Sequence, residues 1–121
     1  MRRNHLVILG LAALSGGALA HHSFAMFDMK KDVTAEGVVT DFRWTNPHAW
    51  MHVDIVDPKG GKANWALEMT SPNTLVRHGW RRSSFKAGDK VTVTFHPLVN
   101  GKPGGALVKA VLPDRTVLEN K

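Results

Sequence analysis

The sequence predicts a mainly β fold: a small five-stranded barrel of the oligonucleotide/oligosaccharide-binding (OB) type with one short helix, following a cleaved signal peptide. Three observations predict it. The 121 residues suffice for one domain. Five short runs of alternating apolar residues are separated by turns rich in Pro, Gly and Asn. One helix signal falls between the third and fourth runs, which gives the β-β-β-α-β-β order of an OB barrel.

Residues 1–20 are typical of a secretory signal peptide. Arg2 and Arg3 form a basic start, and the apolar run 6–14 is shorter than the roughly 20 residues that a membrane span needs. A small-x-small motif ends at Ala20, where we expect cleavage. The sequence therefore predicts a periplasmic protein whose mature chain has no transmembrane segment.

The mature chain divides into an N-terminal arm, residues 21–32, and an OB-like barrel domain, residues 33–121. Alternation predicts strands at 33–44, 48–57, 62–69, 90–96 and 106–112, with a short edge strand at 116–118. The predicted helix starts at the N-cap Ser71 with Pro72 in its first turn, and it ends at Gly79. Leu75 and Val76 are expected to pack inward. The glycines at 104 and 105 are expected in a loop, 97–105.

The pairing of the second and third strands presents a conflict. If the Gly60-Gly61 hairpin pairs even positions of one strand with odd positions of the other, then either Glu68 or the pair His52 and Asp54 points into the core. A buried acid needs a partner. A β-bulge is the other way to resolve the conflict.

Five segments resemble a family of small exported bacterial proteins, the domain of unknown function 6152 family. They are HHSFAMFD (21–28), WTNPHAW (44–50), SPNTLVRHGW (71–80), FKAGDKVTV (85–93) and LPDRTVL (112–118). The resemblance implies export and a small β domain, and it implies no activity. One position departs from the family pattern: Arg115 stands where the family usually has Gly after Pro-Asp, so the turn there is expected to be looser or of another type.

Composition favours a binding module over an enzyme. The chain has no Cys, hence no disulfide and no thiol nucleophile, and no Ser lies in a nucleophile-elbow context. It carries 16 Lys and Arg against 10 Asp and Glu, but export argues against nucleic acid as the partner. The expected partner is a periplasmic protein or a small ligand.

Histidines carry the first binding hypothesis, which is copper or a related transition metal. Cleavage after Ala20 would make His21 the first residue, so that its amine and its imidazole could chelate one ion. Further candidate ligands are His22, His48, His52 and His96. His48 and His52 lie four residues apart on one strand, about 13 Å, so at most one of them joins such a site. His48 and His96 adjoin the two loops that flank the usual OB binding face, which favours His21 with His48 or His96.

Tryptophans carry the alternative hypothesis, an interaction module for a partner protein or small ligand. Trp44 and Trp50 flank a turn that contains Asn46 and Pro47. Exposed aromatic rings beside such a loop can stack on a flat ligand, although Trp also fills the cores of small barrels. For Trp65 and Trp80, packing in the core is the favoured interpretation.

Overall fold

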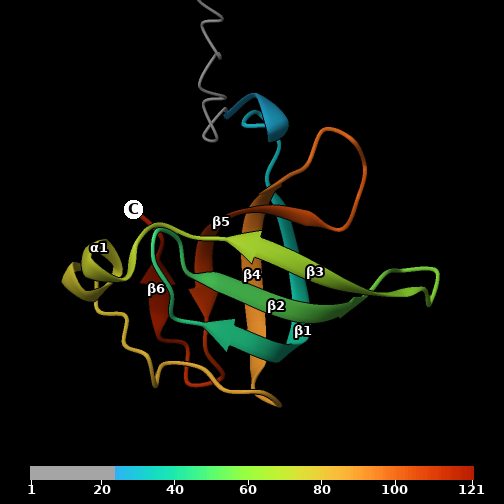
Figure 1. Ribbon diagram of the computed structural model, residues 1–121. Coiled ribbons are helices and arrows are strands. Elements are labelled where there is room, and N and C mark those ends of the chain that lie inside the picture. Colours follow the sequence, from blue (N-terminus) through green and yellow to red (C-terminus); the bar gives the residue numbers. More distant parts are fainter. Residues whose placement is uncertain (1–23) are drawn as a thin grey trace, which may run out of the picture.

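The computed structural model describes residues 24–121 as six strands and two short helices (Figure 1). The predicted signal peptide, its cleavage site at Ala20, and His21 and His22 lie outside the described residues. The elements are η1 (Phe24–Met26), β1 (Val33–Arg43), β2 (Trp50–Val56), β3 (Lys62–Glu68), α1 (Pro72–Arg77), β4 (Lys90–Pro97), β5 (Gly104–Val111) and β6 (Val117–Glu119).

Strands β1 to β5 close into a barrel. The sheet order is β3-β2-β1-β4-β5-β6, and an additional parallel pairing between β3 and β5 joins the two sides. The short strand β6 lies antiparallel on the outer part of β5. Helix α1 sits between β3 and β4 in the chain and at one end of the barrel in space (Figure 1). The predicted mainly β fold, a five-stranded OB-like barrel with one helix, is confirmed.

Strand β1 bends so that it serves two neighbours. Its first half pairs with β4 and its second half with β2, and both pairings include Gly37. A Cβ at Gly37 would lie 2.5 Å from the Asp54 carbonyl oxygen, so the curl requires glycine here. A register shift follows between Val39 and Asp41. Because of this bulge, buried Val39 and half-buried Phe42 both face inward although they differ in parity.

The expected register conflict between β2 and β3 does not occur, because the predicted pairing was wrong. The hairpin loop spans five residues, 57–61, and Val56 pairs with Lys62, so positions of equal parity lie opposite each other. Met51 is opposite Leu67, and both are fully buried. Glu68 pairs with Trp50 on the other face and is half-buried. A loop one residue shorter or longer would have turned the other face of β3 toward the core.

The glycines at 104 and 105 belong to β5, not to the loop in which they were expected. A Cβ at Gly104 would meet the Leu98 side chain at 2.8 Å, and a Cβ at Gly105 would overlap the carbonyl oxygen of His96. Both are buried where β5 is inserted between β3 and β4. Here glycine permits close backbone approach at the barrel seam, and it does not mark a turn.

Helix α1 closes one end of the barrel. The Ser71 hydroxyl accepts a hydrogen bond from the Thr74 amide at 3.4 Å, and Gly79, with φ of 90°, follows the last turn, so the predicted caps are confirmed. Leu75 is fully buried as predicted, whereas Val76 is exposed. Trp80 follows the helix, is fully buried, and donates its indole hydrogen to the Glu119 carbonyl oxygen at 2.8 Å.

The arm that precedes β1 is attached to the end of β4 and the loop that follows it. The Asp28 amide donates to the Pro97 carbonyl oxygen at 2.8 Å, and the Val99 amide donates to the Met26 carbonyl oxygen at 3.0 Å. Phe27 and Leu98 form an isolated β-bridge between these segments. Figure 1 shows the arm beside the β4–β5 loop. Within residues 24–121, no helix has both the length and the apolar character that a membrane span requires.

Candidate functional site

A cavity of about 480 Å³ lies where the arm meets the barrel. The arm, the end of β3, the adjoining parts of β4 and β5, and the last two residues of the chain form its walls. Most of its wall is apolar. Polar or sulfur-bearing side chains also line it, from His48, His96, Glu68, Thr70, Asn120 and Lys121 and from Met26, Met29 and Met69. Its size falls within the range of small-molecule sites, about 300–1,000 Å³.

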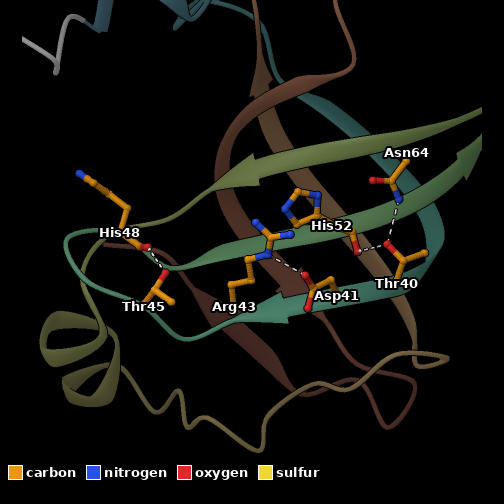
Figure 2. Close-up of polar contacts among 7 residues, drawn as sticks. All are labelled: Thr40, Asp41, Arg43, Thr45, His48, His52 and Asn64. Atoms are coloured by element: carbon orange, nitrogen blue, oxygen red, sulfur yellow. Dashed lines mark hydrogen bonds and ion pairs between the residues drawn. The ribbon is translucent and has the colours of Figure 1, made fainter.

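His48 enters this wall from the turn before β2. The backbone of its neighbour Ala49 exchanges hydrogen bonds with Thr70 and Met69 at the end of β3, at 3.1 and 2.9 Å. The His48 side chain follows this pairing, and its Nδ1 lies 2.7 Å from the Met69 carbonyl oxygen. The same nitrogen is 3.6 Å from a carboxylate oxygen of Glu68. The Thr45 hydroxyl donates to the His48 carbonyl oxygen at 3.0 Å, which holds the turn (Figure 2).

His96 enters the wall from the end of β4. Its Nδ1 lies 3.0 Å from the Lys31 carbonyl oxygen and 3.0 Å from a carboxylate oxygen of Asp32. Both acceptors lie where the arm joins β1. His96 is half-buried and therefore links the arm to the barrel close to the cavity.

The two histidines share one arrangement of the ring. A carbonyl oxygen only accepts hydrogen bonds, so in each case Nδ1 carries the hydrogen. In the neutral ring Nε2 then carries the lone pair, and the ring orientation is set by the backbone. Metal-binding histidines are commonly oriented by this kind of contact between the second ring nitrogen and a carbonyl or carboxylate. His48 and His96 are thus two oriented imidazoles on one cavity wall.

His52 does not line this cavity. It lies on β2 among polar residues of the outer face, beside Arg43 and Asp41, and His48 points away from it (Figure 2). Arg43 Nε donates to an Asp41 carboxylate oxygen at 2.7 Å, and this hydrogen bond is the main reason why the pKa of Asp41 is lowered. A similar contact, from Asn64, lowers the pKa of Asp54 farther along the strand. The spacing argument that separated His48 from His52 agrees with this geometry.

The two tryptophans of the predicted ligand surface, Trp44 and Trp50, lie in different environments. Trp44 is half-buried and packs on Phe42 with ring centroids 5.8 Å apart, as part of the aromatic end of the core. Asn46 is exposed in the turn, which holds a cis bond to Pro47. Trp50 is half-buried on β2, opposite Glu68. Trp80 is core, as favoured, and Trp65 packs on Phe95 with centroids 5.1 Å apart.

Glu68 and Met69 are cavity residues that the sequence pattern did not indicate. Their approach to His48 depends on the register of the end of β3, which the sequence pattern assigned incorrectly. Among residues 24–121 no three His, Cys, Asp or Glu side chains converge as a metal-binding group. A metal at this cavity would therefore need ligands of another kind or from residues 21–23.

Comparison with known proteins places the chain in a family. No curated protein matches the sequence, and no solved structure matches the fold. One family does match, described as "Family of unknown function (DUF6152)", and its model covers residues 9–108. This span covers most of the chain, including β1 to β4 and half of β5. The chain, with its OB-like barrel and two oriented histidines at one cavity, therefore belongs to the DUF6152 family.

Proposed function

We propose that this protein is an exported, periplasmic binding module that holds a copper ion at the cavity between the arm and the barrel. His48 and His96 supply imidazole nitrogens, and the mature N-terminal residue His21 supplies an amine and a third imidazole. The adjacent His22 is an alternative imidazole ligand. The module binds the ion and carries out no reaction.

One observation carries this proposal. His48 and His96 are 48 positions apart in the sequence, yet both line one cavity with Nδ1 on a main-chain carbonyl oxygen. Orienting two imidazoles from different parts of the chain, a turn and a strand end, costs conformational freedom. Apolar side chains would suffice if these positions only had to fill space. A metal site, in contrast, requires the imidazole nitrogen atoms.

The place where the arm is attached supports His21 as a further ligand. Met26 lines the cavity, and its carbonyl oxygen is held by the Val99 amide at 3.0 Å. His21 lies five positions before Met26, and a chain of five steps reaches at most about 17 Å. This chain length supports the proposal that His21 contributes to the site.

Titration with copper tests the proposal. Protein that begins with native His21 is titrated with Cu(II) while the melting temperature and the electron paramagnetic resonance spectrum are recorded. We expect the melting temperature to rise at stoichiometric copper. A ligand that binds only the folded state increases the free energy of unfolding of the protein by RT ln(1 + [L]/Kd). Nitrogen hyperfine structure in the spectrum would identify the ligands.

Three variants make the test specific. His48→Gln and His96→Gln should each weaken binding, and one extra residue before His21 should remove the contribution of the free amine. His52→Gln is the matched control, because His52 lies on the outer face and away from the cavity. Equal losses in His52→Gln and His48→Gln, or no response of the native protein to stoichiometric copper, would overturn the proposal. The latter result would favour a partner or small-ligand module that uses Trp44, Asn46 and Trp50.

A further inference from the structure

We infer that the cavity also binds copper as Cu(I), and that the thioethers of Met26 and Met29 on the arm are ligands to that ion together with the oriented imidazoles. This inference rests on the proposed copper site and extends it to a second oxidation state. It uses side chains that the proposed Cu(II) site does not need.

Met26 and Met29 each keep 47% of their surface exposed although both line the cavity. A side chain that remains half exposed gains little from burial, so packing alone gives a weak reason for two methionines here. Met51 in the core is fully buried, and Met69, which also lines the cavity, is already packed and only 2% exposed.

A volume of about 480 Å³ is far larger than one ion, so ligands must move inward to surround it. His48 and His96 are held by their Nδ1 contacts and have little freedom to do so. Methionine has three rotatable bonds beyond a backbone that here is anchored through Met26, so its sulfur can move while the arm stays attached.

The neutral ligands and the mostly apolar wall of the cavity favour an ion of low charge. Thioether sulfur is a soft, neutral ligand that selects Cu(I), and imidazole binds copper as well. The surrounding wall is mostly apolar; Glu68 and Lys121 are its charged side chains, and Phe27 is an apolar residue of its arm side. Because an apolar environment penalises charge, a monovalent ion with neutral ligands is less costly there than a divalent ion. The cavity is therefore better matched to Cu(I) than to Cu(II) on its arm side.

A competition assay measures this directly. The processed protein is titrated anaerobically, with ascorbate as reductant, against a chromophoric Cu(I) chelator such as bicinchoninate. The test variant is Met26→Leu combined with Met29→Leu, which keeps the size and apolar character of both side chains. We expect Cu(I) affinity to fall about tenfold or more, since even residues that only orient metal ligands contribute about 10- to 100-fold. Cu(II) affinity should stay unchanged.

The control is Met51→Leu, which removes a thioether from the core and leaves the arm intact. X-ray absorption of the Cu(I) complex should show copper–sulfur scattering in the native protein and in Met51→Leu, and lose it in the double variant. A double variant that binds Cu(I) as tightly as the native protein would overturn the inference while leaving the Cu(II) site intact. A native protein that binds copper in neither oxidation state would overturn the proposed function as well.

Discussion

Arg115 is the non-glycine residue among 24–121 that adopts a positive φ, 71°. It closes the turn between β5 and β6, where the Leu112 and Thr116 backbones are joined at 2.9 Å and the Arg115 amide donates to the Leu112 carbonyl oxygen at 2.9 Å. This is the left-handed conformation, which glycine adopts without steric cost. The turn is thus a defined one, and arginine is strained in it.

Replacing Arg115 by Gly should therefore stabilise the protein. An L-residue in the left-handed region costs about 1–2 kcal/mol. Glycine gives back about 0.5–1 kcal/mol through the greater freedom of the unfolded chain. Because Arg115 is exposed and makes no ion pair among the described residues, little else is lost. The net gain is about 0.5–1 kcal/mol, which raises the melting temperature by about 2–8 °C in a domain of this size.

Thermal and urea unfolding of the native protein, Arg115→Gly and Arg115→Ala would measure the effect. The alanine variant removes the same charge but retains a Cβ, so it should remain strained and should gain little. Equal stabilisation in the two variants would show that the arginine charge, not the backbone, is responsible. A less stable glycine variant would refute the strain argument itself.

Two further outcomes follow from the barrel seam and from the acidic residues. Gly105→Ala should destabilise the fold by about 1–3 kcal/mol, the usual cost of overpacking, because the added Cβ would overlap the His96 carbonyl oxygen and the Phe95 ring; urea unfolding would measure it, and a neutral substitution would contradict the tight seam. Asp89→Asn should flatten the loss of stability in acid. The hydrogen bond from Lys86 holds the pKa of Asp89 below its ordinary value of 3.8, so the ionised group stabilises the fold above that pH, and this stability is lost as the pH falls through the lowered pKa. The free energy of unfolding would be measured between pH 2 and pH 5 for the native protein and for Asp89→Asn. The same dependence on pH in both proteins would rule this contribution out.

Local chemistry in the sequence predicted much of the fold. The caps of α1 depend on Ser71 and Gly79 alone, and the turns depend on short runs of Pro, Gly, Asn and Asp, so both can be identified without knowing any distant contact. Alternation located each strand to within about two residues, and the order of elements was enough to predict the barrel.

The candidate site was predictable only in part. His48 and His96 could be placed at neighbouring loops from the strand order, because an OB barrel brings those loops together. The contacts that orient them could not be predicted. They involve main-chain oxygens of Met69 and Lys31, whose positions depend on how β3 ends and where the arm crosses β4.

The sequence by itself determined the strands, their order, the helix caps and the candidate ligand residues, because each of these depends on a residue and its near neighbours. Only the tertiary structure decided the register of β2 against β3, the bulge in β1, the inclusion of Gly104 and Gly105 in a strand, and the cavity that joins arm and barrel. These features arise from packing between segments that are distant in the chain. A shift of one residue in such a contact exchanges the buried and exposed faces of a strand, and no local pattern records it.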